Sequence, residues 1–416
     1  MNYRKLTAVL VTLLLLGVMS AFADSPNDLV IYHWWTAGGE KQAIDAVIQG
    51  FNKKYPEVNV IQNPVAGGGG SVETAQIKTM IMAGQAPDTF QVLLGAGQLA
   101  QWVAVLEQID DIWDGFNVSP VLKDMVTSGG HQYGIPLNIH TSNIMWYNKK
   151  VAQTVGVKMP FTSLPELYQI AEKAKRAGYI PIAFGAGSGQ KLWWIHLAGQ
   201  ILSLIPDAGG DYIQKLYAGQ IDPQNDPQIR ELFEALKKII DNGYINSDYA
   251  ALTWDQAGNL LRTDKALLYP MGDWAKGLFR SSGWKPKIDF DFQLSRGIQA
   301  FHCDFFALSK NAPHPDSVRK WLQYIKTVEA ETVFNPIKGS IPPLFNAPSN
   351  PYDAISKELI TIYKDSGKTH IQDSDAAPPA GNNEAFGDMY SVFATNTDVD
   401  AGIQAFAQAY NTVFGK

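Results

Sequence analysis

The stretch that decides the fold reads Leu29-Val30-Ile31-Tyr32-His33-Trp34-Trp35-Thr36-Ala37-Gly38-Gly39-Glu40. Its first four residues form an apolar run that is typical of a buried strand. Farther along, residues 44, 47, 48 and 51 are apolar at the spacing of one helix face, and a second strand is expected at 58–61. A strand, a helix and a strand in this order predict a βαβ unit, and therefore an α/β fold.

The same alternation of helices and strands continues through the rest of the chain. Ser163 and Glu166 form the capping box of one amphipathic helix, and Asp226-Pro227 begins another. Short apolar segments at 179–184 and 266–271 predict strands between such helices. Because the chain has 416 residues and is 46% hydrophobic, it is long enough for two domains, each with its own core.

The N-terminus has the three regions of a secretory signal peptide. Arg4-Lys5 precedes an apolar run at 8–19, which is followed by Ala21-Phe22-Ala23. The run is shorter than the about 20 residues that a membrane-spanning helix needs. We therefore expect cleavage after Ala23, which removes residues 1–23 and leaves a mature chain in the periplasm. No cysteine stands at the cleavage site, so no lipid anchor is expected.

The charge and the composition narrow the class of partner. The formal net charge is -6 at pH 7 and the lysines and arginines are scattered, which argues against binding to nucleic acid or to an anionic membrane. The single cysteine, Cys303, is expected to be a buried core residue without chemistry. The chain also has 11 tryptophans. Because indole rings are costly to expose unless they pack or bind a ligand, this high number is the first indication of a binding site.

Two further patterns argue against cofactor and metal chemistry. The run Gly67-Gly68-Gly69-Gly70 lacks the Lys-Ser or Lys-Thr of a phosphate loop, so we expect a flexible surface turn. The histidines are dispersed, and none forms an i, i+4 pair around a helical glutamate, which argues against a zinc site. We expect neither a metal nor a cofactor.

Aromatic and acidic residues meet at the end of the first predicted strand, where α/β sheets place their ligands. Trp34, Trp35 and Glu40 lie there. A pyranose has an apolar face and a rim of hydroxyl groups, so its site combines an aromatic ring with charged or amide groups. The alternative is that both tryptophans belong to the core and that Glu40 interacts only with a helix dipole. This segment alone leaves both interpretations open.

The same combination recurs later in the chain. Trp254-Asp255 and Asp273-Trp274 again place an indole beside a carboxylate. Asp304 follows, and Lys338 stands before a glycine that lets its loop approach a ligand closely. When each of these residues is considered alone, a purely structural role explains it equally well. Together they favour a polar and aromatic site built from distant segments.

Several strings of the chain carry a resemblance to a known family, namely 33–40, 86–91, 135–146, 252–258, 271–275 and 337–342. They resemble the extracellular solute-binding proteins of ABC sugar importers, specifically the glucose/mannose-binding branch, and the similarity runs over the whole mature chain. The family fold consists of two α/β lobes with hinge crossings and an interlobe ligand cleft. The resemblance implies a first lobe at 24–137 and 304–345 and a second lobe at 138–303 and 346–416.

The resemblance also implies which residues contact the sugar: Trp34, Trp35, Glu40 and Gln91 from the first lobe, Trp254 and Trp274 from the second, and in addition Asp304, Lys338 and His370. Two positions depart from the family pattern. Leu93 stands where a histidine is expected, two residues after the binding glutamine. The C-terminal binding histidine has no clean match, because either His370 or the segment Asp373-Ser374-Asp375 aligns with it.

The predicted function is therefore that of a receptor. We expect the chain to bind a monosaccharide, glucose or mannose, and to deliver it to the permease subunits of an ABC importer in the inner membrane. We expect a monomer that catalyses nothing. Two alternatives stay open: a secreted glycoside hydrolase, whose retaining form needs two carboxyl groups about 5 Å apart, and a receptor for a longer oligosaccharide.

Overall fold

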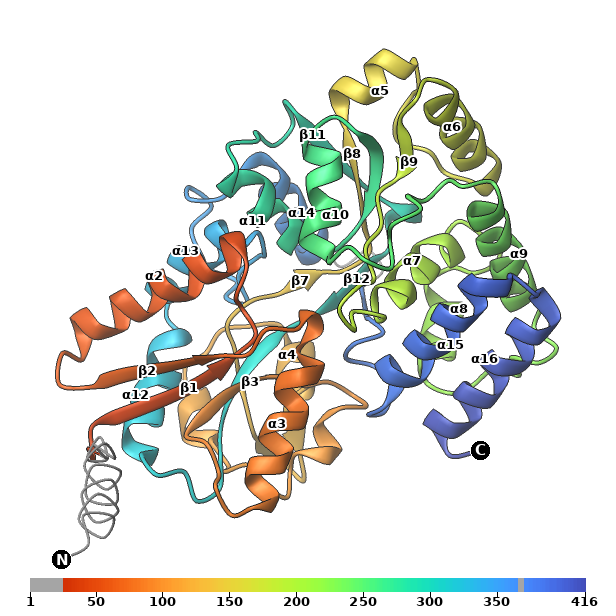
Figure 1. Cartoon of the computed structure of the whole chain (residues 1–416). Coiled ribbons are helices and arrows are strands. Elements are labelled where there is room, and N and C mark those ends of the chain that lie inside the picture. The colour runs from red at the N-terminus through yellow and green to blue at the C-terminus, as the bar shows by residue number, and fades with distance from the viewer. Residues whose placement is uncertain (1–24, 366–369) are drawn as a thin grey trace, which may run out of the picture.

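The computed structural model describes residues 25–365 and 370–416, in which the chain forms two lobes with a short sheet between them (Figure 1). Each lobe has a β-sheet covered by helices. The predicted signal peptide and its cleavage site at Ala23 lie outside the described residues. Within the described ranges, no helix has the length and the apolar character that crossing a membrane requires.

The first lobe is built on a five-stranded sheet with the strand order β2-β1-β3-β13-β6. Its strands are β1 (Asp28–His33), β2 (Asn59–Pro64), β3 (Thr89–Leu93), β13 (Asp304–Leu308) and β6 (Ile135–Pro136). β1 is parallel to β2 and β3, whereas β13 is antiparallel to β3 and β6. Helix α2 (Gly38–Lys54) connects β1 to β2 and buries the predicted apolar face, including Ile44 and Phe51. The predicted βαβ unit is confirmed.

Short and long helices pack around this sheet. They are η1 (Gly68–Gly70), α3 (Ser71–Met82), η2 (Leu99–Gln101), η3 (Asp110–Trp113), α4 (Pro120–Asp124), α12 (Pro315–Ile325) and α13 (Val328–Lys338), together with the hairpin of β4 (Thr127–Ser128) and β5 (His131–Gln132). Aromatic rings fill the space between α12 and the sheet, where Phe306 and Trp321 have ring centroids 5.4 Å apart. Because this apolar core is closely packed, the first lobe is rigid.

The second lobe is built on a four-stranded sheet with the order β11-β8-β10-β9. Its strands are β8 (Ile144–Asn148), β9 (Ile180–Ile182), β10 (Ala266–Pro270) and β11 (Phe290–Leu294). Its helices are α5 (Lys149–Val155), α6 (Leu164–Arg176), α7 (Trp193–Leu202), α8 (Gly210–Tyr217), α9 (Pro227–Asp241), α10 (Trp254–Arg262), α11 (Trp274–Ser281), η4 (Ser295–Gly297), α14 (Ala354–Lys364), α15 (Asn382–Asn396) and α16 (Val399–Phe414). The strands predicted at 179–184 and 266–271 are confirmed as β9 and β10.

Local sequence signals set the starts of α6 and α9. The Ser163 hydroxyl accepts a hydrogen bond from the backbone N–H of Glu166 (3.4 Å), and the Asp226 carboxylate accepts one from the N–H of Gln228 (2.9 Å). Both predicted helix starts are confirmed. The Glu166 carboxylate accepts from the N–H of Thr162 (2.6 Å) and not from that of the capping serine, so only one half of the predicted capping box forms.

A third sheet has three strands in the order β14-β12-β7, and β7 and β12 lie between the lobes in Figure 1. It consists of β7 (His140–Thr141), β12 (Gln299–His302) and β14 (His370–Gln372). The chain leaves the first sheet through β7 and returns to it through β12, which leads into β13. Cys303 stands at that return, fully buried as expected, and burial raises the pKa of its thiol. The residue limits given above for the two lobes stay a prediction.

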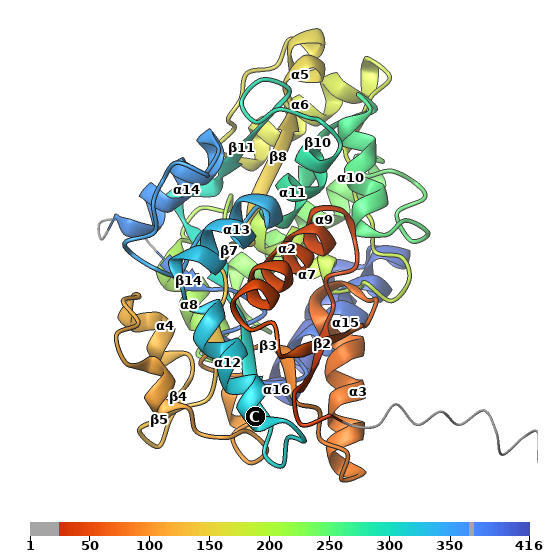
Figure 2. The same ribbon diagram turned by 90° about the vertical axis from the view of Figure 1, so that its left-hand side faces the viewer.

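The two lobes touch through glycines. A Cβ built on Gly39 of α2 would lie 2.9 Å from the carbonyl carbon of Gly277 on α11. A Cβ built on Gly277 would lie 2.4 Å from the carbonyl oxygen of Lys338 at the end of α13. Such distances leave no room for a side chain, so the backbones of the three helices meet directly. Figure 2 shows α2, α11 and α13 next to one another, and the lobes are closed on each other.

Candidate functional site

A cavity of about 300 Å³ lies between the closed lobes. Its walls come from the loop after β1, from the ends of α2 and α13, from the N-termini of α7, α10 and α11, and from the connecting strands. The predicted site residues that line it are Trp34, Trp35, Glu40, Trp254, Trp274, Asp304 and Lys338. Folding thus brings together groups that are far apart in the sequence.

The two adjacent tryptophans after β1 have different surroundings. Trp35 is only 1% exposed, and its ring packs 4.7 Å from that of Phe334 and 5.8 Å from that of Phe306. Trp34 is 8% exposed and rests on Gly70, where a Cβ would lie 2.6 Å from the indole. Trp34 is therefore the ring that faces the cavity, whereas Trp35 belongs mainly to the core and reaches the wall at its edge.

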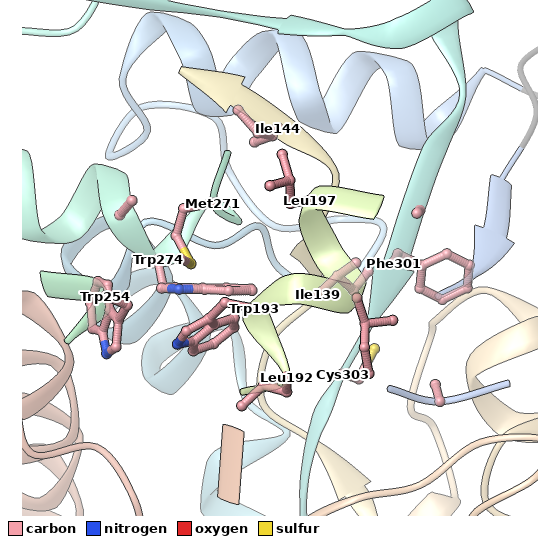
Figure 3. Close-up of a cluster of buried hydrophobic side chains, with 14 of the residues drawn as sticks. Ile139, Ile144, Leu192, Trp193, Leu197, Trp254, Met271, Trp274, Phe301 and Cys303 are labelled. Carbon is pink, nitrogen blue, oxygen red and sulfur yellow. The ribbon is translucent and has the colours of Figure 1, made fainter. Parts of the chain in front are cut away.

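Three indoles form the wall on the second lobe. Trp193, Trp254 and Trp274 lie beside one another in Figure 3, and the rings of Trp193 and Trp274 have centroids 5.7 Å apart. Gln190 fixes two of these residues, because its side-chain oxygen accepts hydrogen bonds from the indole N–H of Trp193 (3.1 Å) and from the backbone N–H of Trp254 (3.0 Å). The arrangement gives the cavity an aromatic surface on the second lobe, in addition to Trp34 of the first lobe.

Glu40 and Lys338 form an ion pair in the cavity wall. The Lys338 Nζ lies 2.8 Å from the Glu40 Oε1, and the side chains are 2% and 12% exposed, respectively. Glu40 stands in the first turn of α2 and Lys338 in the last turn of α13, so each charge also interacts favourably with its helix dipole. The Lys338 Nζ is 5.9 Å from the ring centroid of Trp274. The pair therefore presents two charges beside an aromatic ring.

Gln91 lies behind the cavity wall and not in it. It is fully buried, and both of its polar side-chain atoms are occupied. The oxygen accepts from the backbone N–H of Trp34 (3.1 Å), and the amide nitrogen donates to the Asp304 Oδ1 (2.8 Å). The structure does not bring Gln91 to the cavity surface, because its amide holds the loop after β1 against Asp304, and its contact with a ligand stays a prediction.

Asp304 carries a fixed negative charge at the base of the cavity. Its Oδ2 accepts hydrogen bonds from the side-chain amide of Asn138 (2.7 Å) and lies 3.0 Å from the His140 Nε2. Burial alone would raise the pKa of this carboxyl group, but the hydrogen bond and charge of His140 and the charge of Lys338 outweigh it. The pKa of Asp304 is therefore lowered, and the group is an ionised hydrogen-bond acceptor.

The two C-terminal candidates differ in position. His370 lies outside the cavity: its Nε2 is 3.2 Å from the carbonyl oxygen of Asp365, and its ring packs 5.3 Å from that of Tyr363. The structure therefore does not bring His370 to the cavity, and its contact with a ligand stays a prediction. Asp375 lines the cavity instead, so the alternative segment Asp373-Ser374-Asp375 lies at the site.

Buried ion pairs hold the segment Asp373-Ser374-Asp375 in place. The His302 Nδ1 lies 2.6 Å from the Asp373 Oδ2, and the His196 Nε2 lies 3.0 Å from the Asp375 Oδ2. Burial lowers the pKa of His302, but the charge and hydrogen bond of Asp373 raise it overall to about 9. His302, Asp373 and Asp375 are the group of described residues whose donor atoms, within 4.8 Å of one another, suit a metal ion. The direct hydrogen bonds account for the same geometry without an ion.

The glycine run at 67–70 is not the flexible surface turn that we expected. Gly67 and Gly69 line the cavity, and a Cβ built on Gly69 would lie 2.7 Å from the side chain of Leu192 in the other lobe. Gly69 therefore packs against the second lobe, and a side chain at this position would clash with Leu192. Leu93 also lines the cavity, so an apolar group occupies the position where a histidine was expected.

Sequence reasoning missed several cavity residues: Gln190, Trp193, His140 and His302. One signal was available, since Trp193-Trp194 is a tryptophan pair like the one after β1. His140 lies within a string that resembles the family, but nothing local shows that its ring meets carboxylates far away in sequence. The contacts of such residues with groups far away in the sequence are visible only in the folded structure.

Comparisons with known proteins agree with this architecture. The family described as bacterial extracellular solute-binding protein matches residues 37–332. An "Uncharacterized ABC transporter extracellular-binding protein" of Pyrococcus horikoshii is 39% identical over 384 residues, which cover 90% of this chain and 85% of the relative. A "Probable sugar-binding periplasmic protein" of Rhizobium meliloti is 30% identical over 370 residues, which cover 85% of each chain.

Solved structures share the fold at low sequence identity. The bacterial solute receptor AcbH, described as having an exclusive preference for β-D-galactopyranose, matches with a TM-score of 0.78 and 20% identity over 94% of this chain and 100% of its own. A chitin oligosaccharide binding protein matches with a TM-score of 0.80 and 16% identity over 94% of this chain and 99% of its own. These likenesses confirm the predicted two-lobed α/β fold.

The family match, over residues 37–332, and the Pyrococcus horikoshii relative both extend over most of the chain. The chain belongs to the bacterial extracellular solute-binding proteins.

Proposed function

We propose that this protein is the substrate-binding component of an ABC-type sugar importer. It binds a monosaccharide, glucose or mannose, between its lobes in the periplasm and delivers it to the membrane permease. The observation that carries the proposal is the interlobe cavity, which is lined by Trp34 of the first lobe, by indoles of the second lobe and by acidic and basic side chains. The names of the relatives, which refer to ABC transport and to sugar binding, support the same function.

The chemistry of the cavity suits a pyranose. Its aromatic walls offer a surface for the apolar C–H face of a sugar ring. The Asp304 carboxylate accepts hydrogen bonds and the Lys338 ammonium donates them, so the cavity offers both an acceptor and a donor to the hydroxyl groups of a sugar. Because these groups are largely shielded from water, each hydrogen bond to a sugar hydroxyl is strong and its loss costly.

The size of the cavity favours a small sugar. At about 300 Å³ it lies at the low end of the roughly 300–1,000 Å³ found for small-molecule sites. A receptor for a longer oligosaccharide stays an alternative, since one structural neighbour is a chitin oligosaccharide binding protein. Disaccharides that bind more tightly than hexoses would favour that alternative.

The ionised groups of the cavity serve binding better than hydrolysis. Glu40 is held by Lys338 at 2.8 Å, and Asp304 is kept ionised by its neighbours, so neither is a free general acid. We therefore propose a receptor without catalytic activity. Sustained turnover of aryl glycosides that is abolished by Glu40→Gln would contradict this.

Calorimetric titration tests the proposal. Ligand-stripped protein is titrated with glucose, mannose, galactose, xylose, maltose and cellobiose, and Trp34→Ala serves as the matched variant with a damaged cavity. We expect saturable binding of at least one hexose that is weakened in the variant. Absence of binding to every sugar, or equal binding by the two proteins, would overturn the assignment of this cavity as a sugar site.

A further inference from the structure

His140 stands between two carboxylates that come from different lobes. It lies in the connecting strand β7 and is 2% exposed. Its Nδ1 is hydrogen bonded to Asp273, the residue before α11 in the second lobe. Its Nε2 lies 3.0 Å from the Oδ2 of Asp304, which belongs to strand β13 of the first lobe. Both carboxylates are as deeply buried as the histidine.

These contacts are part of one hydrogen-bonded chain across the molecule. Gln91 accepts from the backbone N–H of Trp34 and donates to Asp304, whose carboxylate meets His140. On the other side of the ring, Asp273 accepts from His140 and directly precedes Trp274. This series of hydrogen bonds therefore begins at the backbone of Trp34 in the wall of the first lobe and ends at the residue before Trp274 in the wall of the second.

Both ring nitrogens of His140 are held by neighbouring groups. Asp304 also accepts from Asn138 (2.7 Å), and Asp273 accepts from the backbone N–H of Thr141 (2.9 Å), so each carboxylate is itself fixed by a second hydrogen bond. The amide nitrogen of Asn138 lies 3.0 Å from the His140 Nε2 as well. The ring is therefore held at Nδ1 by the second lobe and at Nε2 by the first lobe.

We propose that His140 is the positioning residue that ties Asp304 of the first lobe to Asp273 of the second. Its ring fixes the direction in which the Asp304 carboxylate faces the ligand, and it links that direction to the placement of Trp274. The test of this role by measuring ligand affinity rests on the proposed sugar-binding function. The other titratable groups that face this cluster are His302 of β12, 5.2 Å away between ring centroids, and Lys338 of α13.

Three variants test the role of His140 in ligand binding. The probes are D-glucose and D-mannose, titrated by calorimetry. We expect His140→Gln to weaken binding about ten-fold or more, the range for one charge-assisted hydrogen bond. Asp273→Asn should weaken it as well, although Asp273 does not line the cavity. The double variant should be no weaker than His140→Gln alone, because both changes break the same link.

His314→Gln is the matched control. This histidine is also buried and pairs with a carboxylate, since its Nδ1 lies 2.8 Å from the Oδ2 of Asp88, but it does not line the cavity. We expect the control to lower thermal stability and to leave hexose affinity unchanged.

A second measurement does not depend on sugar. Nitrogen-15 NMR of the histidine rings should show that the Nδ1 signal of His140 moves in Asp273→Asn and stays in place in His314→Gln. If neither hexose binds the parent but this shift is found, the sugar assignment fails and the link between the lobes stands. An Nδ1 signal that does not move in Asp273→Asn, or unchanged hexose affinity in both single variants, would overturn the proposal.

Discussion

At the residue scale, the difference between Trp34 and Trp35 shows how one sequence motif serves two purposes. Alternate residues of an extended chain point to opposite sides, so one indole of the pair enters the core while the other faces the cavity. Trp35 packs on Phe306 and Phe334. The identity of the residues does not distinguish the two roles, but their burial predicts different consequences of truncation.

Trp34→Ala and Trp35→Ala should separate binding from stability. We expect Trp34→Ala to cost about 1–3 kcal/mol of hexose binding, through lost apolar contact, with a small effect on folding. Trp35→Ala should instead lower the free energy of unfolding by about 3–5 kcal/mol, because it leaves a cavity in the core. Calorimetric titration and urea unfolding of both variants measure the two quantities. The opposite pattern would show that Trp35 is the ring at the ligand.

Lys338→Met should change the choice among sugars. The variant keeps the aliphatic part of the side chain but removes the charge, and it leaves Glu40 without its 2.8 Å partner. We expect a loss of about 1.5–3 kcal/mol in binding and a new ranking of glucose, mannose and galactose. Trp274→Ala, by comparison, should weaken all three to a similar extent, since their C–H faces differ less than their hydroxyl groups. Equal losses for all three hexoses in Lys338→Met would place the lysine away from the ligand.

At the element scale, helix α3 carries a buried acid without a partner. Glu73 is 1% exposed, and neither of its carboxyl oxygens has a hydrogen-bond partner among the described residues. Desolvation raises the pKa of this group well above its usual value. As the pH rises above about 4.5, the unfolded chain releases the proton before the folded one does. Glu73 therefore destabilises the fold increasingly between that pH and its own higher pKa.

Glu73→Met should stabilise the protein at neutral pH. We expect a gain of about 1–3 kcal/mol in the free energy of unfolding, because an apolar side chain of similar size replaces an unsatisfied polar group. Glu73→Gln should remove the pH dependence but keep most of the polar cost. Urea unfolding at pH 5 and pH 8 measures both effects, and the gain should be larger at pH 8. A gain that is independent of pH would show that the carboxyl group titrates normally.

At the scale of the whole molecule, closure of the lobes depends on helices that meet backbone to backbone. A ligand that contacts both lobes stabilises the closed state, since only differential affinity shifts a conformational equilibrium. The glycines of α2 and α11 permit that contact. A side chain placed there acts on the closed state and leaves the separate lobes intact.

Gly277→Ala should hold the lobes apart. Its Cβ would lie 2.4 Å from the carbonyl oxygen of Lys338, and overpacking of this kind costs about 1–3 kcal/mol. We expect weaker hexose binding and, by small-angle scattering, no contraction on addition of the sugar that makes the parent contract. Gly209→Ala is the control, because a Cβ there meets nothing within 4 Å. Scattering curves of the parent that are identical with and without saturating hexose would contradict a cleft that closes.

Much of the fold is determined by signals that act over a few residues. The apolar run and helix face after Leu29 produced the βαβ unit, and Ser163 and Asp226 began their helices as predicted. These signals are readable because hydrophobic periodicity and capping depend on neighbours within one or two turns. The occurrence of tryptophans next to acidic residues in distant loops likewise indicates a sugar-binding site from the sequence alone.

Tertiary structure alone decided which of these groups meet. It placed Gln91 behind the wall and His370 outside the cavity, and it set Asp375 at the site. It also put His140 between two carboxylates that are 133 and 164 residues away in the sequence. The physical reason is that the packing of the two lobes against each other fixes which side chains are buried and which hydrogen-bond partners they meet. Sequence periodicity, by contrast, indicates only the face on which a residue lies within its own helix or strand.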